Sequence, residues 1–153
     1  MEHDEEQYEK RARAGLIPYI RGSDGVYLYL MMVSSNAKFG GPRPMLSKGK
    51  IEEGETTLEC AIREAEEELG LDRGNLLNAP FLVADERVQL RSGAYNLTVY
   101  AAQIRDRWDF GMWCDETEYT VWVTLEHFME VGRRDHIPYV KTLEAMLMNG
   151  NQE

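Results

Sequence analysis

The feature that most constrains this chain is one helical segment, residues 56–69. Glu59 lies three residues after Thr56, which is the spacing of a capping box, and Gly70 supplies a stop. Four apolar positions recur at the spacing of a helix and predict its buried stripe: Leu58, Ile62, Ala65 and Leu69. A helix of this length needs a sheet or other helices to cover that stripe.

The runs on either side of the helix alternate like strands. Residues 14–20 and 26–33 flank a strong turn signal and predict a hairpin, in which Pro18 favours an edge position or a bulge. Hairpin-spaced strands cannot all be parallel, so we predict an α+β or mixed α/β domain. Further strands are expected at residues 81–90, 95–104 and 119–124, a loop at 34–47 and a final helix at about 138–148.

The length of the chain limits the number of domains, and its net charge limits the partners that it can bind. The 153 residues suffice for one domain, which we place at residues 14–149 between a charged N-terminal leader, 1–13, and a short tail, 150–153. The net charge of −10 disfavours long nucleic acids and anionic membranes as partners. Neither a signal peptide nor a membrane span is evident, so we expect a cytoplasmic protein.

Three carboxylates of the predicted helix share one face. At 100° per residue, Glu64, Glu67 and Glu68 lie within about 100° of one another, beside the apolar stripe. Like charges at this spacing repel, and a divalent cation with oxygen ligands would compensate them. A solvated acidic face is the alternative that the helix alone leaves open.

The segment around these carboxylates resembles a known family. From Gly49 to Leu71 the chain reads GKIEEGETTLECAIREAEEELGL, which resembles the complete Nudix box. Ala65 is a common substitute at its site in that pattern. The required positions are filled by Gly49, Glu55, Arg63, Glu64, Glu67, Glu68, Gly70 and Leu71.

The resemblance implies an α/β/α sandwich with a mixed sheet and a loop-helix-loop metal site. It implies that Glu64, Glu67 and Glu68, with the Gly49 carbonyl, hold Mg²⁺, for which Mn²⁺ can substitute. Arg63 would then orient a box carboxylate through a charge-assisted hydrogen bond. Glu55 would brace the turn or bind metal at the periphery.

The general base is left open at this point. In many Nudix enzymes a late-loop glutamate enters the site, and Glu116, six residues before Trp122, is the leading candidate. Asp115 and Glu118 are its rivals, and Glu67 or Glu64 could serve instead. Two cations before the box are candidate substrate-binding residues, Lys48 and Arg43.

The function that the resemblance implies is hydrolysis of the diphosphate linkage in a small nucleoside diphosphate derivative. Dinucleoside polyphosphates come first, followed by ADP-ribose or FAD-like dinucleotides. The alternative is a Nudix domain that binds a nucleotide as a sensor without hydrolysing it. A homodimer is also open, since dimers are common in the family.

Overall fold

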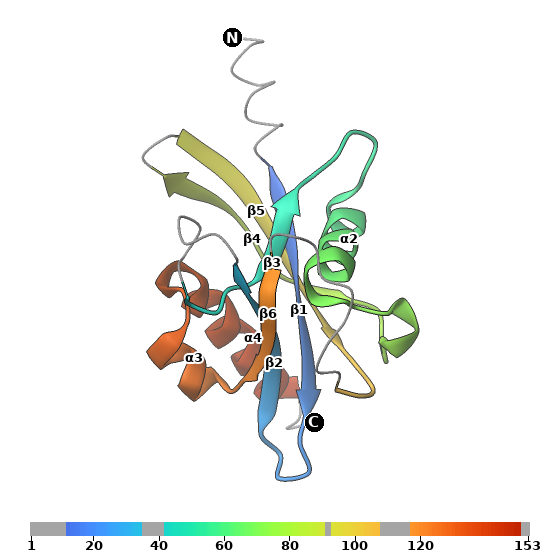
Figure 1. The fold of residues 1–153 in the computed structure, drawn as a ribbon, viewed down its shortest axis with the longest axis vertical. Helices are drawn as coiled ribbons and strands as arrows, with labels where there is room; N and C mark the ends of the chain where they lie inside the picture. Colours follow the sequence, from blue (N-terminus) through green and yellow to red (C-terminus); the bar gives the residue numbers. More distant parts are fainter. Residues whose placement is uncertain (1–11, 35–41, 91–92, 108–116, 151–153) are drawn as a thin grey trace.

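The computed structural model describes residues 12–34, 42–90, 93–107 and 117–150. Their centre is a six-stranded sheet in the order β4-β5-β1-β2-β6, with β3 paired to β1 (Figure 1). The β1–β5 pair is parallel and the others are antiparallel, so the predicted mixed sheet is confirmed. The strands are β1 (Arg13–Arg21), β2 (Tyr27–Ser34), β3 (Ser47–Lys50), β4 (Phe81–Leu90), β5 (Gly93–Gln103) and β6 (Thr117–Val123).

Helices cover both faces of the sheet, which makes the α/β/α sandwich (Figure 1). Helix α2 (Thr57–Leu69) packs on one face through Cys60, Ala61 and Ala65. The short helix α3 (Leu125–Val131) and the C-terminal α4 (Ile137–Gly150) close the other face around the buried Phe128 and Leu143. Two short 3-10 helices, η2 (Arg73–Asn75) and η3 (Arg134–His136), complete the described elements.

Helix α2 begins and ends where the sequence predicts. The Thr56 side chain accepts a hydrogen bond from the Glu59 N–H, and the Glu59 carboxylate accepts one from the Thr56 N–H. At the other end Gly70 adopts φ 72°, and its N–H donates to the Ala65 carbonyl. This φ lies in the left-handed region, where glycine carries no Cβ penalty. The ends of the helix are therefore set by local hydrogen bonds.

The prediction that Pro18 marks an edge or a bulge was wrong, because β1 is a central strand. The Tyr19 carbonyl accepts a hydrogen bond from the N–H of Ile104, which directly follows β5, so the backbone polar groups of Tyr19 face β5. Because these groups alternate in direction along a strand, the carbonyl of Pro18 faces the opposite side, where β2 and β3 lie. On that side β3 pairs with residues 13–16 and β2 with residues 19–21. Pro18 lies between these two pairings, where its missing N–H leaves no hydrogen bond of the ladder unmade.

One strand and one α-helix escaped the sequence analysis, besides the two short 3-10 helices. Strand β3 falls at the end of the expected loop and reads Ser-Lys-Gly-Lys, which has no strand propensity; its pairing with Arg13–Leu16 of β1 makes it a strand. Helix α3 spans 7 residues, too short for a clear periodic signal. At the chain ends, Arg13 begins β1 and Gly150 ends α4, while residues 1–11 and 151–153 lie outside the described residues.

No helix in the described part of the chain is both long enough and apolar enough to cross a membrane.

The capping box of α2 can be tested by stability measurements. We expect Thr56→Ala to lower the free energy of unfolding by about 1 kcal/mol, because the Glu59 N–H loses its acceptor. Thr56→Ser keeps the hydroxyl and should stay within about 0.5 kcal/mol of wild type. Urea titrations followed by circular dichroism would measure both, and equal stability of the two variants would contradict the assignment.

Candidate active site

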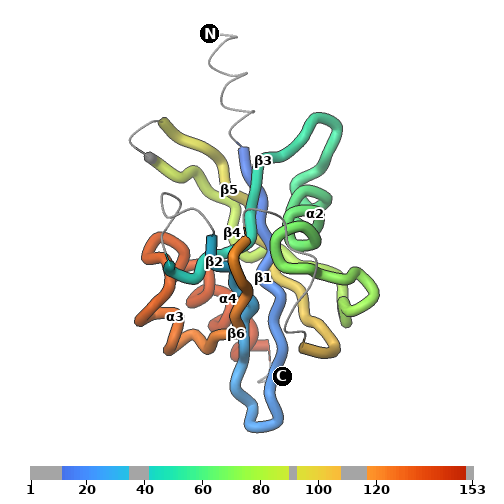
Figure 2. Tube along the Cα trace, viewed as in Figure 1, coloured from blue at the N-terminus to red at the C-terminus, as the bar shows by residue number. Residues whose placement is uncertain are grey.

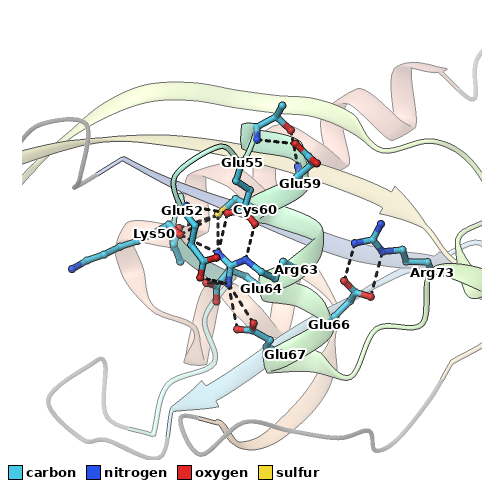
Figure 3. Close-up of polar contacts among 12 residues, drawn as sticks. Lys50, Glu52, Glu55, Glu59, Cys60, Arg63, Glu64, Glu66, Glu67 and Arg73 are labelled. Carbon is cyan, nitrogen blue, oxygen red and sulfur yellow. Dashed lines mark hydrogen bonds and ion pairs between the residues drawn. The ribbon is translucent and has the colours of Figure 1, made fainter. Parts of the chain in front are cut away.

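The turn of residues 51–56 and the first turns of α2 form one polar cluster. The chain leaves β3, turns back and enters α2, so this turn lies beside the helix (Figure 2). Arg63 stands at the centre of the cluster and points toward the turn (Figure 3). The site is thus built by one continuous stretch of chain, with β3 on one side and α2 on the other.

Arg63 ties the turn to the helix through short contacts. Its Nε and Nη2 donate to the two oxygens of Glu55 at 2.7 and 3.1 Å, a forked pair that only a guanidinium can make. Nη1 donates to Glu64 at 2.9 Å and approaches Glu67 at 3.4 Å. The hydrogen bond from Arg63 holds the pKa of Glu55 below its usual range. Arg63 therefore contacts Glu55 in the turn and both Glu64 and Glu67 on the helix.

The three box carboxylates differ in their surroundings. The Glu64 side chain is 12% exposed and Glu67 is 51% exposed, and both face Arg63 (Figure 3). Glu68 is buried and turns toward β3, where it accepts from the Ser47 hydroxyl at 2.9 Å and from the Lys48 N–H at 3.0 Å. Glu66 points away and pairs with Arg73 at 3.0 Å. The helix thus separates Glu66 from the three carboxylates on the β3 side.

The Glu64 carboxylate packs directly against Gly49. A Cβ added to Gly49 would overlap the Glu64 carboxylate. Beneath them, the Cys60 thiol donates weakly to the carbonyls of Gly49 and Lys50 at 3.5 and 3.4 Å. Burial, reinforced by Glu55, raises the pKa of Cys60 to about 12, so this thiol stays protonated.

The donor set fits a hard cation, although the described side chains do not converge on one point. Glu64, Glu67 and Glu68 together with the Gly49 carbonyl offer only oxygen atoms, which are the ligands of Mg²⁺ and Mn²⁺. Across the described ranges, no three His, Cys, Asp or Glu side chains are placed to hold a metal ion together. Arg63 holds two of the carboxylates and β3 holds the third, so a cation would compete with these donors.

The two predicted substrate-binding cations lie outside this cluster. The Lys48 ammonium extends to the opposite face of the sheet, 5.8 Å from the centre of the Tyr95 ring. Burial, together with the positive charges of Arg133 and Arg13, lowers the pKa of Lys48 to about 8. Arg43 lines a surface hollow of about 580 Å³ beside α3 and α4, together with Arg134 and Lys141.

The predicted general base lies beyond the described residues. Glu116 and its rival Asp115 fall in the undescribed segment 108–116. Glu118 is described and is exposed on β6. Glu64 and Glu67 are the other candidates, and the structure places both beside Arg63.

Sequence reasoning missed Ser47 as a partner of the box. This residue is fully buried and holds Glu68, but it stands in a segment that reads as a loop, so no periodicity marks it. It also missed Arg13 and Arg133, whose proximity to Lys48 depends on strand pairing and on the α3–α4 connection. The register of β1 against β3 and β5 would have placed Arg13 near Lys48, but this register cannot be read from the sequence.

Comparisons with known proteins bear on the family and the fold. The family model described as NUDIX domain matches residues 10–143, and no curated protein matches the sequence. Among solved structures, an Ap4A hydrolase of C. elegans in a binary complex is similar at TM-score 0.74 and 17% identity, over 90% of this chain and 98% of that one. The NUDIX domain of Shewanella oneidensis NrtR, complexed with ADP ribose, is similar at TM-score 0.76 and 14% identity, over 90% of this chain and 88% of that one. A Nudix hydrolase of M. smegmatis, RenU, is similar at TM-score 0.68 and 16% identity, over 92% of this chain and 88% of that one.

The chain therefore belongs to the Nudix family. The family match covers most of the chain, and the similar structures share its fold. This confirms the family that the box residues predict.

The close packing of Gly49 on Glu64 predicts a stability loss. Gly49→Ala should lower the free energy of unfolding by about 1 kcal/mol, because the end of the Glu64 side chain must move away from the new methyl group and loses its hydrogen bond from Arg63. The control is Gly74→Ala, where a Cβ would lie 3.5 Å from its nearest neighbour, an ordinary contact; it should stay within about 0.5 kcal/mol of wild type. Chemical denaturation would measure both, and equal losses would contradict the packing argument.

The lowered pKa of Lys48 predicts a pH dependence of stability. The unfolded chain keeps the Lys48 proton up to about pH 10.5, whereas the folded protein releases it near pH 8. Stability contributed by this site should therefore rise between pH 8 and 10.5. We expect Lys48→Met to be more stable than wild type at pH 7 and this advantage to shrink across that window.

Urea midpoints at pH 7, 8, 9 and 10 would measure the effect, with Lys50→Met, an exposed lysine on the same strand, as control. If the extra stability of Lys48→Met over wild type were the same at every pH, the lowered pKa of Lys48 would be refuted.

Proposed function

We propose that this protein hydrolyses the diphosphate linkage of a small nucleoside diphosphate derivative in a reaction that depends on Mg²⁺. The observation that carries the proposal is the placement of Glu64 and Glu67 around Arg63, with Glu68 and the Gly49 carbonyl beside them. Every atom of this set that could bind a cation is an oxygen, and family membership supports the same chemistry.

In this proposal Glu64, Glu67, Glu68 and the Gly49 carbonyl hold the cation, with Mn²⁺ as a substitute. When bound, it neutralises the diphosphate oxygens and lowers the pKa of a bound water. Arg63 keeps Glu64 aligned through the 2.9 Å hydrogen bond and fixes the turn through Glu55. Ser47 and the Lys48 N–H keep the buried Glu68 from rotating away.

A carboxylate must also accept the proton of the attacking water. Glu67 fits this role because its side chain is half exposed and, among the described residues, is held by 3.4 Å contacts to Arg63 alone. Glu116 remains the candidate from the late loop. The pH profile of kcat in Glu67→Gln and Glu116→Gln variants would distinguish the two.

The substrate class is proposed from the family and the similar structures. Lys48 and Arg43 are the proposed contacts to the substrate anion. An Ap4A hydrolase and an ADP-ribose complex stand among the similar structures, so dinucleoside polyphosphates and ADP-ribose are the first compounds to test. The alternative is a nucleotide-binding sensor that does not hydrolyse its ligand; the similar NUDIX domain of NrtR is in complex with ADP ribose.

The decisive experiment combines a substrate panel with one variant. Purified protein is incubated with Ap4A, ADP-ribose and FAD in Mg²⁺ or Mn²⁺, and products are separated by chromatography. We expect Glu67→Gln to lower kcat/KM at least about 100-fold, because an amide cannot accept the proton or carry the charge. Its half-exposed side chain makes a folding defect improbable as the cause.

Glu66→Gln is the matched control on the same helix. Its carboxylate pairs with Arg73 away from the site, so activity should stay within about twofold of wild type. Mn²⁺ binding by electron paramagnetic resonance should weaken in Glu67→Gln and not in Glu66→Gln. Nucleotide binding without any product would favour the sensor, and full activity of Glu67→Gln would overturn the proposed site.

A further inference from the structure

The two oxygens of the Glu68 carboxylate are held differently. Its Oε1 accepts one hydrogen bond from the Ser47 hydroxyl at 2.9 Å and another from the Lys48 N–H at 3.0 Å. By contrast, Nη1 of Arg63 lies 3.4 Å from both oxygens of Glu67, so that contact does not distinguish them. Strand β3 therefore holds Glu68 by one chosen oxygen, and neither of its two donors acts on Oε2.

These hydrogen bonds lie in the interior of the protein. Ser47 is fully buried and Glu68 is 5% exposed. Ser47 pairs with Leu16 of β1, which packs in the same core cluster as Ala65 and Leu69 of α2. A hydrogen bond to a charged oxygen is stronger in such apolar surroundings than in water, because the effective dielectric constant is lower. Turning the Glu68 carboxylate would break both bonds inside this core.

Of the two donors, only the hydroxyl depends on the side chain at residue 47. The Lys48 N–H is a backbone donor, which any residue except proline would supply at that position. The pairing of β3 with β1 fixes the backbone of Ser47, and its side chain reaches Glu68 on the α2 face of the sheet. The hydroxyl is therefore the part of this arrangement that a single substitution removes.

The number of oxygens that a carboxylate offers affects the choice of cation. Mg²⁺ requires a near-ideal octahedron of oxygens, and the two oxygens of one carboxylate lie too close together to span neighbouring corners of it. Ca²⁺ binds about six to eight oxygens in a flexible geometry and accepts both oxygens of a carboxylate. A carboxylate that can offer only one oxygen therefore disfavours Ca²⁺ relative to Mg²⁺.

We propose that Ser47 is a positioning residue, whose hydrogen bond to Oε1 makes Glu68 a ligand through one oxygen and so favours Mg²⁺ over Ca²⁺. This inference deepens the proposed function and rests on it, because it takes Glu68 as a ligand of the cation. Coordination through both oxygens of Glu68 would require Oε1 to give up the Ser47 hydroxyl and the Lys48 N–H. Coordination through Oε2 alone keeps both bonds.

The test measures metal binding and needs no turnover. Mn²⁺, which shares the octahedral oxygen coordination of Mg²⁺, is titrated into the full chain and followed by electron paramagnetic resonance. Mg²⁺ and Ca²⁺ are then added as competitors, which gives a dissociation constant for each ion. We expect Ser47→Ala to weaken Mg²⁺ binding about fivefold, because Glu68 loses a donor that holds it.

The informative quantity is the ratio of the Ca²⁺ to the Mg²⁺ dissociation constant. In Ser47→Ala this ratio should fall at least about threefold, because Oε1 then has one hydrogen bond fewer to give up. Both constants are measured within one variant, so the ratio does not depend on the fraction of protein that is folded. A general loss of structure would weaken both ions alike and leave the ratio unchanged.

Thr57→Ala is the matched control. Thr57 begins α2 and is half-buried, and its hydroxyl lies 2.6 Å from the Tyr100 hydroxyl instead of a box carboxylate. Both substitutions thus remove a hydrogen-bonded hydroxyl at the interface of α2 and the sheet. The affinities of Thr57→Ala and their ratio should stay within about 1.5-fold of wild type.

The outcomes separate this inference from the proposed function. A wild-type ratio in Ser47→Ala, or an equal fall in Thr57→Ala, would refute the role of Ser47; loss of Mn²⁺ binding in Glu67→Gln would then still support the hydrolase. A fall of the ratio in Ser47→Ala alone, in a protein that hydrolyses no substrate, would support the role of Ser47 and refute the proposed hydrolysis. Wild-type protein that binds no Mn²⁺ would refute the metal site and the inference together.

Discussion

The forked pair between Arg63 and Glu55 is the interaction on which the candidate site depends. It joins the turn that follows β3 to the second turn of α2, and from there Arg63 reaches Glu64 and Glu67. Without it, Glu64 and Glu67, two like-charged side chains of the same helix, would repel each other toward solvent. Charge-assisted contacts of this kind are strong enough to offset that repulsion, so one arginine organises both the backbone turn and the carboxylates.

The carboxylates themselves are held in unequal ways, and this has a chemical consequence. Glu68 is buried and fixed by two donors from β3, whereas Glu67 is half exposed and loosely held. A fixed carboxylate suits the role of a permanent ligand, and a loosely held one suits the transfer of a proton. The two residues are neighbours in sequence, so the difference arises only from what each side chain meets across the helix surface.

Strand β3 connects the two faces of the sheet. Ser47 points to α2 and holds Glu68, the next residue points to Tyr95 on the other face, and Gly49 returns to Glu64. A four-residue strand thus presents its side chains alternately to the carboxylates and to a group of cations. This alternation explains why an acidic helix and a basic cluster can lie so close without neutralising each other by direct contact.

The sequence by itself determined the limits of α2, the mixed character of the sheet and the identity of the box residues. Capping boxes, C-terminal glycines and hydrophobic periodicity are local signals, and they act over only a few residues. Tertiary structure alone decided that Pro18 lies in a central strand, that Ser47–Lys50 pairs with β1, and that Arg13 and Lys48 meet over Tyr95. These features depend on which strands become neighbours and in which register, and pairing partners far apart in the chain leave no mark on either segment read alone.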